Sequence, residues 1–359
     1  MKILFVSPYP ILAGSSRLRI HQYLPYLEAH RHEAMVWSFL SMEGYRKLYQ
    51  RGSFLAKAMA VLAGVARSLV LLLKVRRFDL CMIHREAAPA GGGLLEWLIA
   101  KLSRRLIYDF DDALFEPNVS AANRRFAFLK STRKVARLLS RCDAAIACNN
   151  YLESYSQKLA RKTYQLQTPV DTQLFKPCAK AENAKVVIGW IGSHSTAPYL
   201  VLAREALQRL CAAFAGALQI DIVGAGDFRL DGVPAQYKPW RLENEVEDLR
   251  QLDIGIMPMP DDRWTKGKCG FKALLYMSAG LPVVCSPVGF NREIVIPGDN
   301  GFWAETSAQW CEALQRLVED QSFRRQMGAS GRRLVEEKFS LEKCAPRFEQ
   351  ILRAVVEMD

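Results

Sequence analysis

Short apolar runs alternate with longer stretches of helical periodicity along the whole chain of 359 residues. A first series of such runs covers residues 3–7, 34–39, 79–83, 105–109 and 144–148. A second series covers residues 186–191, 219–223, 253–257 and 282–285. Short apolar strands separated by helices are typical of parallel sheets that helices cover on both faces. The pattern therefore predicts an α/β protein with two doubly wound units.

The boundary between the two units is expected where this alternation stops. Residues 169–185 contain Pro169 and Pro177 among polar positions, which is the composition of a linker. We therefore assign residues 1–168 to a first Rossmann-like domain and residues 186–338 to a second one.

The last segment, residues 339–359, has the pattern of one helix. Its apolar positions have the spacing of a single helix face and are Phe348, Ile351, Leu352 and Val355. This helix either caps the second domain or crosses back to the first, and the pattern fits both arrangements.

The longest apolar stretch runs from residue 54 to residue 73 and is interrupted by Lys57, Arg67 and Ser68. A membrane-spanning helix needs roughly 20 mainly apolar residues, and an arginine near its centre is costly. We interpret the stretch as a helix packed on the first sheet, and an interfacial membrane helix is the alternative.

Positive charge is concentrated in the first half of the chain. Residues 1–180 contain 28 Lys and Arg against 13 Asp and Glu, whereas the remainder has a net charge of −3. The basic pairs are Arg76-Arg77, Arg104-Arg105, Arg124-Arg125 and Arg133-Lys134. Such asymmetry favours an anionic partner, and a merely solvated surface is the alternative. Because aromatic residues are not interleaved with these pairs, we expect an anionic membrane surface and no nucleic acid.

The cysteines and the amino terminus indicate the compartment. Nine cysteines are scattered without a Cys-x-x-Cys pair, which argues against a disulfide framework or a zinc site. The apolar run at residues 3–7 is too short for a signal peptide. We expect a cytoplasmic protein without a bound metal.

Ligands of doubly wound sheets bind beyond the carboxyl ends of the strands. In the first domain, the loops at these ends supply candidate ligand-binding residues: Gly14, Arg17, Arg19, His84 and Arg85. The two arginines after the first strand could clamp a phosphate or a carboxylate.

Adjacent carboxylates follow the fourth predicted strand. Asp111 and Asp112 either cap a helix or bind hydroxyl groups and accept a proton. Their position at a strand end makes them the candidate catalytic residues of the first domain.

In the second domain, residues 192–196 precede a predicted helix and residues 224–227 follow a strand. The glycines at 224 and 226 resemble a dinucleotide fingerprint, but Arg229 occupies the third glycine position. This departure and the position in mid-chain argue against a nicotinamide cofactor.

Lysines gather where a helix is expected to begin, near Gly270. Lys266 and Lys268 precede the helix and Lys272 lies in its first turn. Cations are unfavourable at a helix amino end, so a bound diphosphate would compensate for them. The alternative is a surface network in which Asp261 and its neighbour pair with the lysines.

The stretch from residue 253 to residue 303 resembles the nucleotide-sugar site of family-4 glycosyltransferases, also called glycosyl transferases group 1. Those enzymes have the GT-B fold, in which two Rossmann-like domains face a central cleft. The resemblance rests on residues 280–284 (GLPVV) and 299–302 (DNGF), and extends to residues 169–171 and 188–193.

Two departures from this family concern its charged residues. Its members usually carry two glutamates eight positions apart, where this chain has Gly267 and Leu275. Many also hold the donor diphosphate with an arginine and a lysine in the loop that corresponds here to residues 193–196.

The resemblance implies transfer of a sugar from a nucleoside-diphosphate donor, with retention at the anomeric carbon and without a cofactor or metal. It makes the first-domain candidates acceptor-binding residues. It places the donor among Gly192, Ser193, His194, Trp240, Asp261, Lys266, Lys268, Gly270, Phe271, Lys272 and Glu293. Trp240 would lie near the base, and Asp261 or Glu293 near the ribose or the sugar.

The sequence therefore predicts a glycosyltransferase of polysaccharide biosynthesis at the cytoplasmic face of the membrane, with a lipid-linked or surface-glycan acceptor. The alternative is a catalytically silent protein that binds a nucleotide or a glycan. A nucleotide-binding dehydrogenase is a weaker third possibility.

Overall fold

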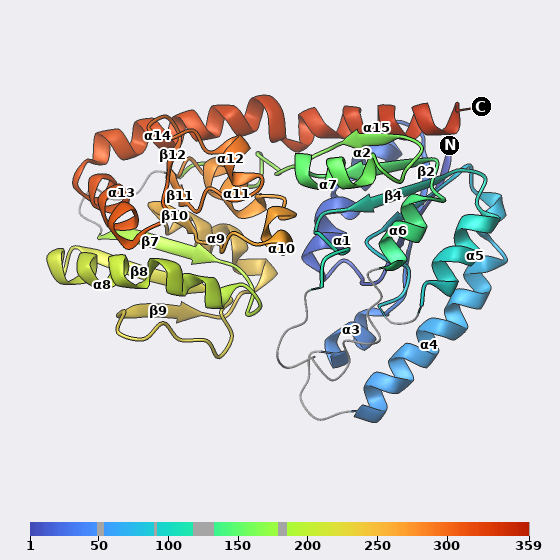
Figure 1. The fold of residues 1–359 in the computed structure, drawn as a ribbon, viewed down its shortest axis with the longest axis horizontal. Helices are drawn as coiled ribbons and strands as arrows, with labels where there is room; N and C mark the ends of the chain where they lie inside the picture. Colours follow the sequence, from blue (N-terminus) through green and yellow to red (C-terminus); the bar gives the residue numbers. More distant parts are fainter. Residues whose placement is uncertain (49–53, 90–91, 118–132, 179–184, 359) are drawn as a thin grey trace. The chain divides into compact units, whose positions relative to one another are not determined.

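The computed structural model describes residues 1–48, 54–89, 92–117, 133–178 and 185–358 (Figure 1). The chain forms two compact units. Unit 1 contains Met1–Thr168 and Cys344–Asp359, and unit 2 contains Pro169–Lys343. Each unit is built on a six-stranded sheet. The predicted α/β class with two doubly wound parallel sheets is confirmed.

The sheet of unit 1 has the strand order β2-β1-β3-β4-β5-β6, and all its pairs are parallel. Its strands are β1 (Lys2–Ser7), β2 (Glu33–Ser38), β3 (Leu80–His84), β4 (Leu106–Phe110), β5 (Ala144–Ala147) and β6 (Thr163–Gln165). Its helices are α1 (Gly14–Arg19), α2 (Leu24–Ala29), α3 (Met42–Leu48), α4 (Phe54–Leu72), α5 (Leu94–Leu102), α6 (Arg133–Leu139), α7 (Asn150–Ser156) and most of α15 (Leu341–Val356), with 3₁₀ turns η1 (His21–Tyr23) and η2 (Val75–Arg77).

The sheet of unit 2 has the order β12-β11-β10-β7-β8-β9, again with parallel pairs. Its strands are β7 (Val186–Ile191), β8 (Leu218–Val223), β9 (Ala235–Lys238), β10 (Ile254–Met257), β11 (Val283–Cys285) and β12 (Gly301–Trp303). Its α-helices are α8 (Arg204–Ala213), α9 (Glu245–Arg250), α10 (Arg263–Lys266), α11 (Phe271–Ser278), α12 (Asn291–Ile294), α13 (Ser307–Glu319) and α14 (Gln321–Leu334). It also contains the 3₁₀ helices η4 (Ala197–Ala203) and η5 (Leu242–Asn244) and the π-helix η6 (Val335–Phe339).

Alternate residues of the central strands in unit 2 enter different apolar clusters. In β7, Val187 and Ile191 belong to one cluster, whereas Ile188 and Trp190 belong to the other. Because successive strand residues point to opposite faces, the sheet has a core on each face. This two-sided burial explains why the strands have continuous apolar sequences.

The last helix, α15, packs against the sheet of unit 1. Phe348 is 1% exposed and lies between the rings of Tyr23 and Phe5, with centroid distances of 4.3 and 6.2 Å. On the same helix, Glu349 is 2.9 Å from the His32 Nε2 atom. Of the two arrangements that the sequence left open, α15 therefore adopts the one in which it joins the first sheet.

Several elements differ from the sequence-based expectation. Strands β6, β9 and β12 were not predicted. The helix expected after residues 192–196 is present, and it begins as the 3₁₀ helix η4 and continues as α8. Helix α4 packs against the rest of unit 1 along one narrow side only, through Gly64, Ser68 and Leu71, and most of the helix expected to pack on the sheet is exposed. The pair Arg124-Arg125 lies outside the described residues.

Candidate functional site

Three loops of unit 2 meet at the carboxyl ends of β7, β8 and β10, as parallel strands require. They contain residues 192–196, residues 224–227 and residues 258–270. At Gly224, which has φ +85°, a Cβ would lie 2.1 Å from the Gly192 carbonyl oxygen. At Gly226, a Cβ would lie 3.2 Å from that of His194. The first two loops therefore touch, and glycine is needed for their close approach.

Lys272 brings the third loop into this group. The residue is half-buried, and its Nζ donates to the Thr196 hydroxyl at 3.1 Å. The Nζ atom also lies 4.5 Å from the ring centroid of Trp190. A Cβ at Gly192 would lie 2.8 Å from this atom, so a larger residue there would displace the ammonium group.

Burial is the main cause that lowers the pKa of Lys272, to about 7, and the nearby charge of Lys268 lowers it further. Among the described residues, no carboxylate forms an ion pair with the Lys272 Nζ atom. A lysine that is buried without a counter-ion is costly, because its charged form loses hydration. An incoming anion would relieve this cost.

The helix that carries Lys272 begins at a glycine. Gly270 is the N-cap of α11, has φ +64°, and makes no side-chain cap hydrogen bond. A Cβ there would approach Phe290 to 2.9 Å and Ile294 to 3.1 Å, so α11 lies close to α12. Helix amino ends of this kind attract anions through their N–H groups and the helix dipole.

The other lysines near this helix have different surroundings. Lys266 pairs with the exposed Asp261 at 3.1 Å, the surface ion pair that the sequence left as an alternative. Lys268 is half-buried, and its Nζ lies 5.1 Å from the Trp264 ring centroid. Asp262 caps α10. Of the predicted donor lysines, Lys272 is thus the one enclosed by the loops of the strand ends.

The remaining donor candidates lie at the border of this loop cluster. The Trp240 indole donates to Glu245 at 3.2 Å, and its Cβ would be 3.0 Å from a Cβ at Gly224. Phe271 is half-buried against the apolar core. Glu293 is exposed on α12, the helix that packs near Gly270.

At the two positions where relatives carry glutamates, this chain has residues without a polar side chain, and both residues are buried. Gly267 is buried, and Leu275 is 3% exposed within the core. The next residue, Tyr276, accepts a hydrogen bond from the Ile191 amide at 2.9 Å. Its ring fills the space above Gly255, where a Cβ would approach to 2.3 Å.

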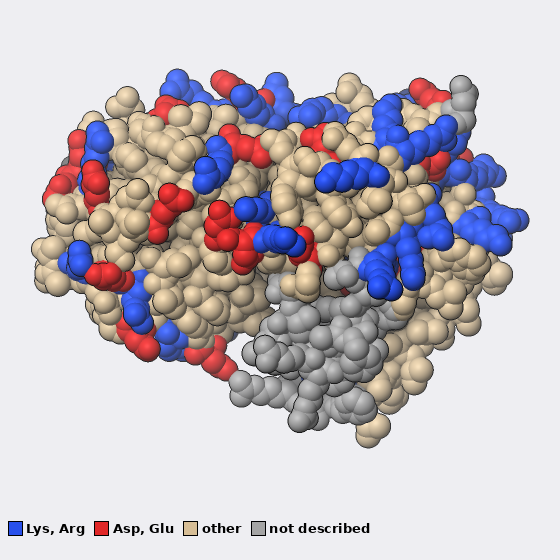
Figure 2. Space-filling view, viewed as in Figure 1, with Lys and Arg blue, Asp and Glu red and all other residues tan. Residues whose placement is uncertain are grey.

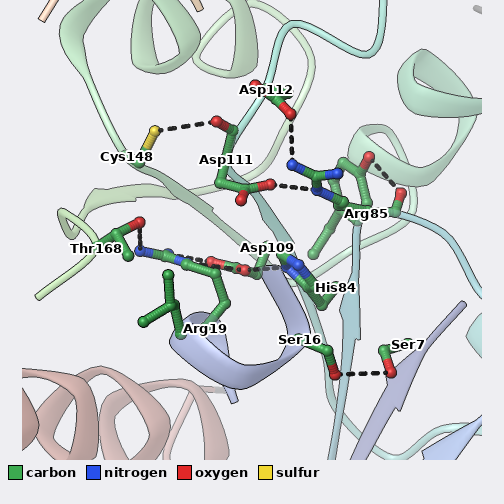
Figure 3. A network of polar contacts seen from close by, with 12 residues as sticks. Ser7, Ser16, Arg19, His84, Arg85, Asp109, Asp111, Asp112, Cys148 and Thr168 are labelled. Carbon is green, nitrogen blue, oxygen red and sulfur yellow. Dashed lines mark hydrogen bonds and ion pairs between the residues drawn. The ribbon is translucent and has the colours of Figure 1, made fainter. Parts of the chain in front are cut away.

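Unit 1 holds a second polar group, in which three buried residues form one network (Figure 3). Asp109 on β4 lies opposite His84 on β3, and the His84 Nδ1 atom is 2.6 Å from its carboxylate. Arg19 donates to both oxygens of the same carboxylate. Burial alone would raise the pKa of Asp109, but Arg19 and His84 outweigh it and lower the pKa.

Arg19 is therefore a structural residue, and its expected role as a clamp for a ligand phosphate is wrong. It is 1% exposed and also donates to the Leu166 carbonyl at 2.9 Å. Of the other candidates after β1, Arg17 is half-buried and Gly14 is exposed, with open space where a Cβ would stand. His84 is fully buried, and its Nε2 atom has no hydrogen-bond partner within the described part of the chain.

Beside this network, Arg85 joins the two predicted catalytic carboxylates (Figure 3). Its guanidinium donates to Asp111 and Asp112. Its backbone has φ +61°, a conformation that costs a non-glycine residue of order 1 kcal/mol. The Tyr108 hydroxyl donates to the Arg85 carbonyl at 2.8 Å and stabilises this conformation.

Burial would raise the pKa of Asp111, but Arg85 lowers it far below its usual range. A carboxylate of this kind stays charged at neutral pH, which suits it to stabilise positive charge or accept a hydroxyl hydrogen bond. It is a poor proton acceptor, because a general base works best near the operating pH. The described residues after Asp112, up to 117, form turns and not a helix, so helix capping does not explain the pair.

Two residues of these sites were not predicted. Trp190 lies under the Lys272 ammonium, and Asp109 organises the network in unit 1. A charged residue inside an apolar strand was the visible signal for Asp109. No local signal marked Trp190, because its partner is 82 positions away in the sequence.

Comparisons with known proteins concern the fold and the second unit of the chain. Residues 185–320 match the family model described as Glycosyl transferases group 1. A search of curated proteins finds no match.

Three solved structures illustrate the structural likeness. Sucrose-phosphate synthase from Thermosynechococcus elongatus has a TM-score of 0.73 and 15% identity over 98% of both chains. A glycosyltransferase from Rickettsia africae has a TM-score of 0.69 and 13% identity over 100% of this chain and 99% of that chain. HepE of Anabaena, solved with UDP and glucose, has a TM-score of 0.66 and 16% identity over 99% and 100%. The two units thus have the GT-B fold, and the part of the chain that matches the Glycosyl transferases group 1 model lies within the second unit.

Proposed function

We propose that the protein is a glycosyltransferase whose unit 2 binds a nucleoside-diphosphate sugar. The observation that carries this proposal is Lys272, a half-buried lysine whose ammonium group lies against Trp190 and Thr196 and forms no ion pair with a carboxylate in the described structure. It lies in the first turn of α11 and is enclosed by the loop that contains Gly192 and Thr196. A diphosphate there would meet a lysine, helix N–H groups and glycine-lined backbone together.

The same arrangement suits the chemistry of sugar transfer. The bond between the anomeric carbon and the diphosphate breaks, and negative charge grows on the leaving oxygen. Preorganised positive groups stabilise this charge more in a water-poor site than in water. In relatives the corresponding charge comes from the loop at 193–196, and Lys272 would supply it here from α11.

We propose UDP-glucose as the first donor to test. HepE of Anabaena, which shares the fold, was solved with UDP-glucose. In this chain Trp240 lies beside Gly224, where a stacked base would continue the diphosphate site.

In unit 1, the proposed acceptor residues are Arg85, Asp111 and Asp112, with His84 next to them. The carboxylates of Asp111 and Asp112 would accept hydrogen bonds from an acceptor hydroxyl and so orient it. We further propose transfer with retention to a lipid-linked or surface glycan during polysaccharide biosynthesis, on the cytoplasmic side of a membrane.

Titration calorimetry and product analysis test the proposal. The purified chain is incubated with UDP-, GDP- and ADP-sugars, and nucleoside-diphosphate release is measured with and without glycan acceptors. We expect saturable binding of one nucleoside diphosphate and slow hydrolysis of its sugar donor. Absence of binding to every nucleotide would refute the proposed function.

A catalytically silent binding protein is the second candidate, because Leu275 is buried in the core where relatives carry a glutamate. This candidate predicts tight nucleotide binding without release of product from any donor and acceptor combination. Turnover with one donor would exclude it.

A further inference from the structure

Helix α4 packs against the rest of unit 1 along one narrow side. Its buried positions, Gly64, Ser68 and Leu71, recur at helical spacing, and the Ser68 hydroxyl donates to the Gly64 carbonyl at 2.7 Å. At Gly64, a Cβ would approach the Phe39 ring to 2.5 Å. A larger residue at position 64 would push α4 away from Phe39.

The opposite side of α4 is apolar and exposed. Leu55, Met59, Leu62 and Leu69 lie on one stripe and are 78%, 68%, 67% and 62% exposed. In Figure 2 the outline of α4, at the lower right, is an almost continuous tan strip. Surface helices of globular proteins normally present polar residues on this side. The 18 residues Leu55–Leu72 have the length and composition of a membrane-crossing helix. Only 17% of this segment is buried inside the protein, so most of its apolar surface is exposed.

Basic residues gather where the apolar stripe ends. Exposed positions directly after α4, and at the carboxyl end of the neighbouring helix α5, are Lys74, Arg76, Arg77, Lys101 and Arg104. Among the acidic residues described nearby, Asp79 pairs with Arg104 at 3.6 Å. The end of the stripe therefore carries net positive charge.

Helix α5 adds residues typical of a membrane interface. Leu94 is 69% exposed and Trp97 is 40% exposed, and the Lys101 Nζ atom lies 5.3 Å from a Trp97 ring centroid. A hollow of about 500 Å³ adjoins these two residues and is also lined by Arg137 and Arg141. Trp and basic residues together are favoured at the level of lipid headgroups.

We propose that the exposed stripe of α4 docks the protein on an anionic lipid bilayer, with the helix parallel to the membrane plane. The leucines would enter the boundary of the acyl chains, and the basic cluster would meet lipid phosphates. Because Gly64, Ser68 and Leu71 stay packed on unit 1, the helix lies on the membrane and does not cross it. Apolar insertion and a basic patch are the two signals that stable attachment requires. This docking does not depend on the activity proposed above.

Co-sedimentation of the full chain with vesicles tests the proposal. Vesicles of phosphatidylcholine alone are compared with vesicles that also contain phosphatidylglycerol. We expect binding to the anionic vesicles that weakens with salt. The double variant Leu62→Glu/Leu69→Glu should lose about tenfold or more in affinity, since two inserted side chains become charged. Arg76→Glu/Arg77→Glu should lose a similar factor on anionic vesicles alone.

A matched control separates docking from a general effect of added charge. Leu174 is 51% exposed in unit 2, so Leu174→Glu should bind vesicles as the unaltered chain does. Unchanged melting temperatures would show that every variant is folded. The proposal is overturned if Leu62→Glu/Leu69→Glu binds normally, or if neutral and anionic vesicles bind equally. It is also overturned if the chain is a dimer in solution that this variant dissociates, because the stripe would then pair with a second copy.

Discussion

At the scale of single residues, the two units use buried charge in opposite ways. In unit 1, Arg19 and His84 both pair with the buried Asp109 carboxylate. In unit 2, Lys272 has hydroxyl and aromatic neighbours but no carboxylate partner in the described structure. A closed ion-pair network serves the fold, whereas an uncompensated cation at a strand end indicates a site for an anion.

The first prediction concerns Lys272→Met. Removal of the ammonium group should weaken nucleoside-diphosphate affinity about 10- to 100-fold, as expected for a lost charge-assisted hydrogen bond. The variant should also be more stable than the original chain. Since the folded-state pKa is about 7 and the ordinary value is 10.5, the destabilisation is complete below pH 7 and fades as pH rises toward 10.5.

Calorimetry and denaturant unfolding at pH 6 and pH 9 check this prediction. The stability gain should be larger at pH 6, and diphosphate affinity of the unaltered chain should fall above pH 7. Lys176→Ala, at an exposed position of the same unit, is the control and should change neither quantity. Equal diphosphate affinity in Lys272→Met and the unaltered chain would contradict the assignment.

The second prediction contrasts two aspartates of unit 1. Asp111→Asn should lower turnover about 100-fold or more while nucleotide affinity is kept, because the charge near the acceptor is lost. Asp109→Asn should instead destabilise the protein by about 3–5 kcal/mol, since it leaves Arg19 buried without its counter-ion. Steady-state kinetics and chemical unfolding of both variants distinguish these roles. Full activity in Asp111→Asn would make the Arg85 cluster purely structural.

At the scale of elements, strand ends and helix starts determine where the site forms. The strands and loops around residues 192 and 224 could be recognised because glycine ends an apolar run there, and the helix after residue 270 could be recognised because an apolar run follows a polar loop. The short strands β6, β9 and β12 could not, since their sequences are only partly apolar and they are three or four residues long. The exposed side of α4 was also hidden, because composition does not reveal which face of an apolar helix is covered.

The third prediction compares the glycines at the starts of two helices, α11 and α1. Gly270 has φ +64° and is crowded by Phe290, so Gly270→Ala should destabilise unit 2 by about 1–3 kcal/mol. Gly14 opens α1 without crowding, so Gly14→Ala should be neutral or stabilising by up to about 1 kcal/mol. Urea unfolding of both variants checks the contrast. Equal effects would show that the local backbone at Gly270 does not control α11.

At the scale of the whole molecule, the alternation of strands and helices was sufficient to predict two parallel sheets, because it repeats over the entire chain. Pairings between distant residues were beyond prediction. Arg19 and Asp109 are 90 positions apart, and His32 and Glu349 are 317 apart. Such contacts depend on which strands become neighbours in the sheet, and local sequence does not encode this order.

The last prediction follows from the place of α15 in unit 1. Phe348→Ala removes a buried ring between Tyr23 and Phe5, and should cost about 3–5 kcal/mol. Each unit has its own sheet and core, so heating should produce two transitions. The substitution should lower the transition of unit 1, whereas a bound nucleoside diphosphate should raise that of unit 2. Differential scanning calorimetry measures both, with Leu174→Ala as a control at an exposed position. A single transition that both changes shift together would show that the two sheets unfold as one cooperative unit, and the ligand would then stabilise α15 as well.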